Sequence, residues 1–339
     1  MKIVILDGYT ENPGDLSWEG LEKLGDLTVY DRTSLTDVQE VIDRIGDAEI
    51  VFTNKTPMPR EVFDTCTNIR YVGVLATGYN VVDVDAAKEK NIPVCNIPTY
   101  GTAAVGQFAI ALLLEICHHV GHHDKAVHEG RWENNPDWCF WDYPLIELDG
   151  KVMGIIGYGR IGQATGRIAQ ALGMKVLAYD AYRNPALESE TCQYADLDEV
   201  LAKSDVIALH CPLFSETEGM INRESIAKMK DGVVLVNTSR GGLVKTEDLI
   251  EGIRARKFFG VGLDVYEEET KNVFEDRSDE ILEHSTTARL LSFPNVMITS
   301  HQGFFTQEAL AAISRTTLDN AVAFEKGETN SNEVLKRES

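Results

Sequence analysis

Short apolar runs rich in β-branched residues alternate with segments of helical period along the first hundred residues. Residues 18–24 and 36–45 repeat apolar side chains every three or four positions, as one face of a helix requires. This alternation is typical of a doubly wound, mostly parallel sheet, and therefore of an α/β fold. The predicted strands are residues 3–6, 28–30, 50–53, 69–75 and 94–96.

The alternation restarts at Lys151 and runs longer. Before it, residues 103–117 are almost uniformly apolar and predict a long buried helix. A last helix, residues 306–324, is expected to pack back on the first domain, and the polar tail 326–339 is expected to be loosely held. Six strands make a complete dinucleotide-binding sheet, and six are predicted: residues 151–156, 175–179, 206–209, 233–237, 260–264 and 296–299.

Composition and charge limit the classes of partner that the chain is expected to bind. The 339 residues are too many for one ordinary core, and the formal net charge of −22 repels polyphosphates and anionic lipids, so nucleic acid and membrane partners are disfavoured. The longest apolar run, residues 108–117, is shorter than the roughly 18 residues of a membrane-spanning helix. Six scattered cysteines without a CxxC pair, and the lack of a signal-peptide pattern, favour the cytoplasm. Small anionic substrates remain compatible with this charge.

A glycine-rich turn, Gly-Tyr-Gly-Arg-Ile-Gly, follows the first predicted strand of the second region and opens a helix. In a dinucleotide-binding loop of this spacing, the glycines permit a tight turn, close approach of a pyrophosphate, and close packing of the helix on the strand. Because strand, turn and helix occur in this order, the turn is interpreted as a cofactor loop. Its expected cofactor-binding residues are Gly157, Gly159, Arg160, Ile161 and Gly162.

The acid that ends the next strand selects the cofactor. Asp180 lies 18 residues beyond Gly162, where a carboxylate binds the ribose hydroxyls and repels a 2′-phosphate. This position favours NAD over NADP. Arg183, three residues further, is the nearby cation that could accommodate a 2′-phosphate instead.

Three polar residues follow strand ends in the second region, where open α/β sheets place their ligands. Arg240, Glu269 and His301 can together bind a carboxylate, orient a proton donor and donate a proton, as reduction of a keto acid requires. Taken singly, His301 could be a structural histidine, and residues 267–269, all Glu, could be a solvated charge run.

The chain resembles the D-isomer-specific 2-hydroxyacid dehydrogenases over essentially its whole length. The resemblance rests on the glycine loop and on four further motifs: His210-Cys-Pro-Leu, Asn237-Thr-Ser-Arg-Gly-Gly, Gly262-Leu-Asp-Val-Tyr-Glu-Glu-Glu and Thr299-Ser-His-Gln-Gly. Residues 71–83 and 140–145 resemble the glycerate dehydrogenase (hydroxypyruvate reductase) branch. The insert 272–291 and the Gln-Gly-Phe-Phe run after His301 look more like D-lactate dehydrogenases.

The resemblance implies a domain organisation. A flavodoxin-like substrate domain would comprise residues 1–99 and 301–339, and a Rossmann NAD-binding domain would comprise residues 100–300, with an active-site cleft between them. The reaction implied is reduction of a small anionic 2-keto acid, best matched by hydroxypyruvate or glyoxylate, to the R-2-hydroxy acid. A lactate or bulkier keto-acid reductase, or a non-catalytic NAD-sensing partner protein, is the alternative.

The resemblance also implies a role for single residues. Arg240 would bind the substrate carboxylate and polarise the keto oxygen, His301 would donate the proton, and Glu269 would stabilise protonated His301 and orient its ring. Substrate would further contact Thr77, Gly78 and Tyr100. Asp264 and Thr238 would face the nicotinamide, and the remaining expected cofactor contacts are His210, Cys211, Pro212, Thr217 and Gly303.

Three further features carry expectations. Residues 132–142 contain three of the four tryptophans and are expected to form a homodimer contact that covers a neighbour's active site; burial within the same subunit is the alternative. His118, His119, His122 and His123 have a spacing that could bind a metal, but a helix-end packing role is favoured, and no metal is expected. Lys55 is the one evident cation of the loop 54–57, which disfavours a phosphorylated substrate.

Overall fold

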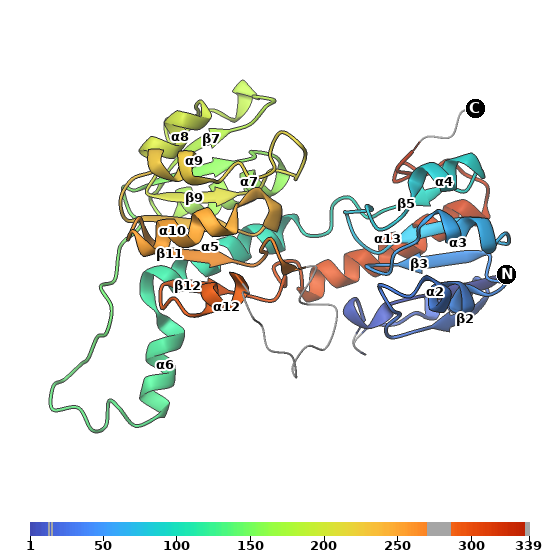
Figure 1. The fold of residues 1–339 in the computed structure, drawn as a ribbon, viewed down its shortest axis with the longest axis horizontal. Coiled ribbons are helices and arrows are strands. Elements are labelled where there is room, and N and C mark those ends of the chain that lie inside the picture. Colours follow the sequence, from blue (N-terminus) through green and yellow to red (C-terminus); the bar gives the residue numbers. More distant parts are fainter. Residues whose placement is uncertain (13, 15, 270–285, 336–339) are drawn as a thin grey trace. The chain divides into compact units, whose positions relative to one another are not determined.

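The computed structural model describes residues 1–12, 14, 16–269 and 286–335. The chain forms two compact units, one of residues 1–100 and 305–339 and the other of residues 101–304 (Figure 1). These limits lie within a few residues of the predicted domain limits at 99/100 and 300/301. Each unit is built around its own parallel sheet.

The first unit contains a five-stranded parallel sheet of order β2-β1-β3-β4-β5, which is the flavodoxin-like order. Apolar β-branched residues fill the central strands, and both faces are covered by helices. The strands are β1 (Lys2–Ile5), β2 (Asp26–Val29), β3 (Ile50–Thr53), β4 (Tyr71–Val74) and β5 (Val94–Cys95); the helices are α1 (Glu19–Glu22), α2 (Val38–Ile45), α3 (Arg60–Thr65), α4 (Val84–Glu89), α13 (Gln307–Glu325) and the 3₁₀ helix η1 (Gly8–Thr10).

The second unit contains a seven-stranded parallel sheet of order β12-β11-β10-β9-β6-β7-β8. Read from β8, this is the Rossmann order with β12 added at the far edge. The strands are β6 (Val152–Ile156), β7 (Lys175–Tyr179), β8 (Cys192–Tyr194), β9 (Val206–Leu209), β10 (Val233–Asn237), β11 (Phe258–Leu263) and β12 (Val296–Ile298); the helices are α5 (Thr102–His118), α6 (Val120–His128), α7 (Arg160–Ala171), α8 (Leu197–Lys203), α9 (Arg223–Lys228), α10 (Thr246–Arg254), α12 (Thr286–Leu291), η2 (Pro185–Leu187) and η3 (Gly241–Leu243).

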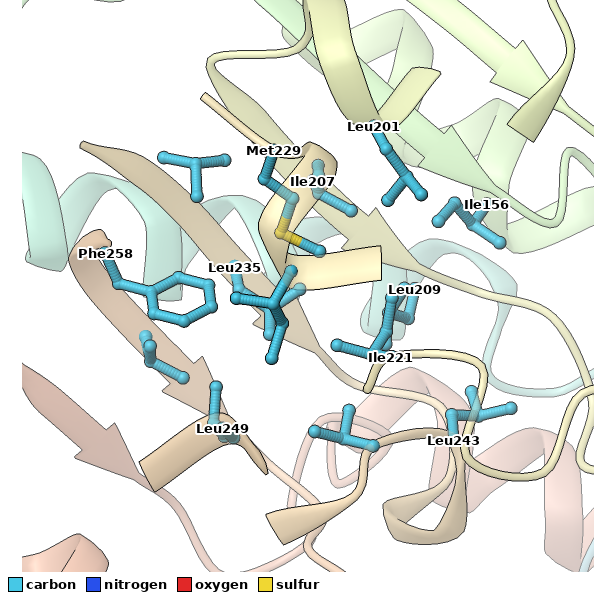
Figure 2. Packing of buried hydrophobic residues seen from close by; sticks show 14 of the residues in the cluster. Ile156, Leu201, Ile207, Leu209, Ile221, Met229, Leu235, Leu243, Leu249 and Phe258 are labelled. Atoms are coloured by element: carbon cyan, nitrogen blue, oxygen red, sulfur yellow. The ribbon is translucent and has the colours of Figure 1, made fainter. Parts of the chain in front are cut away.

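Helices on both faces of the seven-stranded sheet bury its side chains. Leu201 of α8 and Leu249 of α10 pack on one face, with Leu209 and Leu235 of the sheet (Figure 2). Ile226 of α9 belongs to the same cluster. The apolar helix α5 packs on the other face beside α7. Because parallel strands with both faces covered must be apolar along their whole length, these strands are near-continuous runs of Val, Ile and Leu. The predicted α/β class with two doubly wound parallel sheets is confirmed.

The prediction of six strands in the second region was wrong by one. The strand missed is β8, three residues at the edge of the sheet that pair with β7. Its sequence, Cys-Gln-Tyr, contains no β-branched residue, so no periodic signal marked it. The position of β8 matters for function, because its presence makes β6, β7 and β8 one complete half of a nucleotide-binding sheet.

The prediction for the last helix is confirmed, whereas the prediction for the tail is wrong. α13 belongs to the first unit, where Phe324 lies 4.9 Å from Tyr71 of β4 between ring centroids, so its predicted packing is confirmed. The prediction of a loose tail was wrong for residues 326–335. Val334 donates a backbone hydrogen bond to Val94 of β5, and Asn332 donates one to Asn320 of α13. These bonds tie the tail to the sheet despite its polar composition; residues 336–339 lie outside the described residues.

The long apolar helix ends one residue after its predicted limit at 117, and the chain bends there. His119 has a left-handed φ of 49°, and α6 continues after it at an angle of 60° to α5. Within the described residues no single helix has the length and apolarity to span a membrane, although α5 and α6 taken together as a bent pair do. In this fold α5 is a core helix, with eight of its residues buried in the second unit.

Candidate functional site

The glycine loop connects β6 to α7, and its three glycines meet different surroundings. At Gly157, φ is +94° and a Cβ atom would lie 2.4 Å from the backbone nitrogen of Cys211, so only glycine fits. At Gly162 a Cβ would lie 2.2 Å from the carbonyl oxygen of Gly157. At Gly159, the N-cap of α7, a Cβ would meet nothing within 4 Å, and φ is −73°. The fold therefore requires glycine at positions 157 and 162, whereas the space beside Gly159 is open.

We expect the variants Gly159→Ala and Gly162→Ala to separate ligand binding from folding. Gly159→Ala should change the free energy of unfolding by less than about 1 kcal/mol but weaken NADH binding about tenfold or more, because its methyl group enters the space for the pyrophosphate. Gly162→Ala should cost about 1–3 kcal/mol of stability, because its methyl group meets backbone. Thermal melts and fluorescence titration with NADH measure the two effects; equal NADH affinity in Gly159→Ala and wild type would refute this use of the loop.

Asp180 is held in place beside the glycine loop. It follows β7, and its two carboxylate oxygens accept hydrogen bonds from the backbone nitrogens of Tyr158 (2.7 Å) and Tyr182 (2.9 Å). The backbone of Gly157 also donates to Tyr179. Arg183 forms an ion pair with Asp196 on β8's side of the sheet, so its cation is already engaged by a carboxylate. This geometry favours a free ribose hydroxyl at Asp180 over a 2′-phosphate.

His210 and Cys211 follow β9, the strand beside β6, so they lie at the topological switch point of this sheet. The imidazole of His210 lies 2.9 Å from the hydroxyl of buried Thr165 on α7, and burial lowers the pKa of His210 to about 4. The ring is therefore neutral at physiological pH and braces β9 against α7. Burial also raises the pKa of the Cys211 thiol to about 11, so this cysteine is a packing residue rather than a thiolate.

The loop after Cys211 is closed by Thr217, whose hydroxyl donates to the carbonyl of Pro212 (2.7 Å) and accepts from the nitrogen of Phe214 (2.8 Å). Thr217 therefore shapes the segment in which Pro212 lies exposed. Thr238 lies directly after β10. Unlike the hydroxyl of Thr217, its buried hydroxyl oxygen has no hydrogen-bond partner among the described residues. An unpartnered buried hydroxyl at a strand end, together with the open space at Gly159, fits a bound dinucleotide.

Arg240 is presented by a turn that Asn237 builds. The side chain of Asn237, fully buried at the end of β10, accepts from the nitrogen of Ser239 (3.0 Å) and donates to the carbonyl of Arg240 (2.9 Å). The guanidinium of Arg240 donates to the carbonyl of Ser239 (2.7 Å) and is exposed. The turn thus holds the backbone while the cation stays accessible to an anion.

Asp264, at the end of β11, organises the segment that carries His301. Its side chain is only 2% exposed and accepts hydrogen bonds from the Thr299 hydroxyl (2.6 Å) and from the nitrogens of Gln302 (3.0 Å) and Gly303 (2.8 Å). Its carbonyl accepts from the nitrogen of His301 (3.0 Å). His301 has a positive φ of 51°, which is unusual for a residue other than glycine. The four bonds to Asp264 hold His301 in this strained conformation.

The side chains of His301 and Glu269 face each other. Nδ1 of His301 lies 3.3 Å from Oε2 of Glu269, whose side chain is mostly buried, while His301 is 40% exposed. The two preceding acids have other partners: Glu267 accepts from the nitrogen of Thr246 (3.0 Å), and Glu268 lies 3.2 Å from the Thr287 hydroxyl. Residues 267–269 are therefore three committed carboxylates rather than a solvated charge run. With Nδ1 bound to Glu269, Nε2 of His301 is left for a substrate.

β10, β11 and β12 are adjacent in the sheet, so the turns that carry Arg240, Glu269 and His301 leave it along one edge. The predicted residues of the first unit lie in its loop after β4 and beyond: Thr77, Gly78 and Tyr100. Thr77 is fixed by its hydroxyl, which donates to the carbonyl of Ile97 (2.8 Å), and by its carbonyl, which accepts from Asn96 (2.8 Å). Among the described residues, the backbone nitrogens of Thr77 and Gly78 donate to no acceptor.

Sequence reasoning gave no role to Asn237, Thr299 and Thr165, the residues that position Arg240, His301 and His210. Asn237 and Thr299 stand inside the recognised motifs, three and two residues before the functional side chain, so the motifs themselves carried the signal. Thr165 lies 45 residues from His210 and only the fold brings the two together.

The histidines at the α5–α6 bend pack against the following loop. His119 stacks on Tyr143 with ring centroids 4.3 Å apart, and His122 Nε2 lies 2.6 Å from Asp142 Oδ2. His123 lies 5.1 Å from Phe140. Within the described part of the chain, no group of three or more metal-ligating side chains is placed to hold a metal ion.

Comparison with known proteins places this architecture in a family. Residues 110–303 match the NAD binding domain of the D-isomer specific 2-hydroxyacid dehydrogenases. The chain is 65% identical over 327 residues to a hydroxypyruvate reductase of Blautia hydrogenotrophica, covering 96% of this chain and 98% of that protein. It is 38% identical over 269 residues to the D-lactate dehydrogenase of Escherichia coli, covering 79% of each.

A solved structure agrees with these relatives. The structure of D-lactate dehydrogenase from Aquifex aeolicus, complexed with NAD and lactic acid, superposes with a TM-score of 0.84 at 30% identity and covers the whole of both chains. The motifs quoted from the sequence, the two parallel sheets and the glycine loop are thus accounted for together. The chain belongs to the D-isomer specific 2-hydroxyacid dehydrogenase family and is an NAD-dependent oxidoreductase that acts on 2-hydroxy acids and 2-keto acids.

Proposed function

We propose that this enzyme reduces hydroxypyruvate to R-glycerate, and glyoxylate to glycolate. The observation that carries the chemistry is the 3.3 Å pair of His301 Nδ1 and Glu269 Oε2, beside the turn of Arg240. The choice of substrate is supported by the 65% identical hydroxypyruvate reductase, against 38% for the D-lactate dehydrogenase. When bound, NADH supplies a hydride to the keto carbon.

Residues of this chain bind the substrate, stabilise the developing charge and donate the proton. Arg240 binds the substrate carboxylate and stabilises the negative charge that develops on the keto oxygen. His301 donates a proton from Nε2 to that oxygen, and the negative charge of Glu269 stabilises the protonated ring and fixes its orientation. The free backbone nitrogens of Thr77 and Gly78 contribute hydrogen bonds to the carboxylate, and Tyr100 contacts the substrate.

For the cofactor, we propose that the amides of the glycine loop, with Arg160 and Ile161 at the start of α7, hold the pyrophosphate, and that Asp180 binds the adenosine ribose. The loop of residues 210–217 lines the adenosine side, and Thr238 offers its hydroxyl to the nicotinamide side. Asp264 and Gly303 act there through the turn that they build around His301.

A panel of keto acids tests the substrate. The kcat/KM values of hydroxypyruvate and glyoxylate, with NADH, should exceed those of pyruvate, phenylpyruvate and 2-ketoisocaproate. A marked preference for pyruvate would place the enzyme with the lactate dehydrogenases, to which the insert 272–291 points in sequence; most of that insert lies outside the described residues. A preference for phenylpyruvate or 2-ketoisocaproate would contradict the proposal that the substrate is a small keto acid.

Asp180→Ala should relax the preference for NADH over NADPH. The variant loses both the ribose acceptor and the repulsion of a 2′-phosphate, which together correspond to about a 10- to 100-fold change in the ratio of kcat/KM values. Because Asp180 also holds the nitrogens of Tyr158 and Tyr182, general loosening of the loop would weaken both cofactors in parallel. The ratio is therefore the measurement, and an unchanged ratio would argue against a role in cofactor choice.

Glu269→Gln should lower kcat for keto-acid reduction by about 10- to 100-fold, the effect of losing one charged hydrogen bond. Glutamine keeps the shape of the side chain but removes the carboxylate 3.3 Å from the imidazole of His301. KM should change less than kcat, because Glu269 contacts His301 rather than the substrate. Glu268→Gln, which alters the carboxylate facing Thr287, is the matched control and should leave kcat near the wild-type value.

We further propose a cytoplasmic homodimer. α6 and the segment after it extend away from the seven-stranded sheet (Figure 1). This segment exposes Trp132, Trp138 (84% exposed) and Trp141. Burial within the same subunit is thereby contradicted for these tryptophans. An apolar surface of this kind favours a second copy of the chain as its partner, with the segment covering the neighbour's active site. A monomer in light scattering at micromolar concentration would refute the dimer.

The state of the cysteines supports the cytoplasm as the compartment. All six cysteines are free thiols, as a reducing compartment would leave them.

A further inference from the structure

The first unit has a topological switch point of its own. β1 lies between β2 and β3 in the sheet, and the chain passes first to one neighbour and then to the other. In open α/β sheets, ligands bind outside the carboxyl ends of the strands at such a point. Here the switch point is formed by the segment of residues 6–11 after β1 and the loop of residues 54–58 after β3.

Asp7 fixes the loop after β3. Its side chain is buried, and its two carboxylate oxygens accept three successive backbone hydrogen bonds, from the nitrogens of Asn54 (2.7 Å), Lys55 (2.6 Å) and Thr56 (2.8 Å). Three amides around one carboxylate form a rigid anion-binding turn. The backbone position of Lys55, the one cation of this loop, is therefore set by Asp7.

Glu11 is a second buried carboxyl at the same place. It is only 2% exposed, and its Oε1 accepts a hydrogen bond from the amide of Asn54 (2.8 Å), which also bonds to the Thr10 hydroxyl (2.9 Å). Its Oε2 is buried without a hydrogen-bond partner among the described residues. A buried carboxyl with an unpartnered oxygen is costly to the fold, so it calls for a functional explanation.

The loop that carries Lys55 adjoins the loop proposed to bind the substrate carboxylate. β3 and β4 are neighbours in the sheet, so residues 54–58 and 75–83 follow adjacent strand ends. Met58 donates to the carbonyl of Val81 (2.7 Å) and accepts from the nitrogen of Asp83 (2.9 Å). Gly78 is therefore three residues from a segment bonded directly to the Lys55 loop.

We propose that Glu11 is a positioning residue for the keto-acid site, which sets how strongly the Lys55 loop attracts the anionic substrate. Protonated Glu11 supports Asn54 and adds no negative charge beside Lys55. Ionised Glu11 adds a negative charge beside Lys55 and lowers the positive potential that the loop offers to a carboxylate. This inference rests on the proposed function, because it concerns binding of the same 2-keto acid.

Burial and the charges around Glu11 place its ionisation in an experimentally accessible pH range. Burial raises the pKa of Glu11 to about 8; Lys55 opposes the rise and Asp7 adds to it. Among the described residues, these are the charged groups that act on Glu11, and its hydrogen-bond partner Asn54 is neutral. Because the folded pKa lies above the unfolded value, the folded chain binds more protons than the unfolded chain, and ionisation of Glu11 lowers stability progressively as pH rises toward 8.

The test compares wild type with Glu11→Gln, which has the shape and neutrality of protonated Glu11. KM for hydroxypyruvate at saturating NADH is measured at about pH 6.5 and about pH 9, on either side of the pKa of Glu11. Between these values, KM should rise about three- to tenfold more in wild type than in Glu11→Gln, the effect of one nearby charge. Changes that arise at His301 are common to both proteins and cancel in this ratio. Glu328→Gln, which alters an exposed carboxylate after α13, should follow wild type.

Two further measurements complete the design. In a Lys55→Met background, Glu11→Gln should no longer change the pH response of KM, because the cation on which Glu11 acts has been removed. Lys55→Met alone should reduce the pH response of KM relative to wild type, and this second comparison holds even if Glu11→Gln folds poorly. Glu11→Gln should also raise Tm at about pH 9 and leave it near the wild-type value at about pH 5.

The outcomes separate the two proposals. A parallel rise of KM in wild type and Glu11→Gln would overturn the role of Glu11 while leaving the proposed reaction intact. Retention of the Glu11 effect in the Lys55→Met background would overturn the mechanism through Lys55. A wild-type enzyme that reduces none of the keto acids would overturn the proposed function, and this inference with it.

Discussion

His301→Gln should lower kcat for keto-acid reduction by about 10² to 10⁴, the usual contribution of a positioned general acid. In the structure Nδ1 of His301 faces the carboxylate of Glu269, and Nε2 is the ring nitrogen proposed to face the keto oxygen. Glutamine has no group that can donate a proton at a comparable rate, although it can still form hydrogen bonds. The loss should therefore fall on kcat and on kcat/KM alike, since the interaction is made in the transition state.

NADH binding provides the control for His301→Gln. The residue lies on the segment organised by Asp264, away from the glycine loop at β6, so the Kd for NADH in a fluorescence titration should stay within a factor of about two or three. Near-normal turnover in His301→Gln would mean that the proton comes from elsewhere. A large loss of NADH affinity would instead assign His301 a role in binding the cofactor.

Arg240→Gln should raise KM and lower kcat together. Its guanidinium is held next to Ser239 by the Asn237 turn, and no carboxylate neutralises it among the described residues. Loss of a charged hydrogen bond to the substrate carboxylate corresponds to about 1.5–3 kcal/mol, or about a 10- to 100-fold rise in KM. Loss of stabilisation at the keto oxygen should lower kcat by about 10² to 10³.

Arg240→Lys distinguishes charge from geometry. Lysine restores the positive charge but not the fork of donors that can engage a carboxylate and a keto oxygen together. We expect KM to recover more than kcat in this variant, when both are measured by NADH oxidation at several hydroxypyruvate concentrations. If Arg240→Gln raised KM while kcat stayed at the wild-type value, Arg240 would bind only the ground state, and the charge on the oxygen would be stabilised by another group.

The sequence predicted those parts of the fold that rest on strong local patterns. The runs of Val, Ile and Leu that form β6, β9 and β10 must be apolar because both faces of a parallel sheet are covered. The glycine loop was predictable because strand, turn and helix occur in fixed order. β8 was missed since its three residues carry no β-branched pattern. The tail 326–335 was misjudged because the side-chain amides of Asn330 and Asn332 find their acceptor, the side chain of Asn320 of α13, only in the folded chain.

The candidate site was predictable as a set of motif residues, but not in its internal bonding. Nothing in three successive glutamates says that Glu267 and Glu268 bond elsewhere while Glu269 faces His301. The expectation that Asp264 faces the nicotinamide stays a prediction; the sequence did not predict that its side chain holds residues 299–303 through three hydrogen bonds. Glu11 gave no signal at all, because burial of one carboxyl in a polar segment follows from how β1 and β3 meet.

The most direct test of the account is the configuration of the product. The enzyme is incubated with hydroxypyruvate and NADH, the loss of NADH absorbance is followed, and the glycerate formed is separated on a chiral column. A dehydrogenase specific for D isomers, with His301 as proton donor, should give R-glycerate in an amount equal to the NADH consumed, and His301→Gln should give almost none in the same time. Formation of S-glycerate, or the absence of NADH oxidation that depends on hydroxypyruvate, would contradict it.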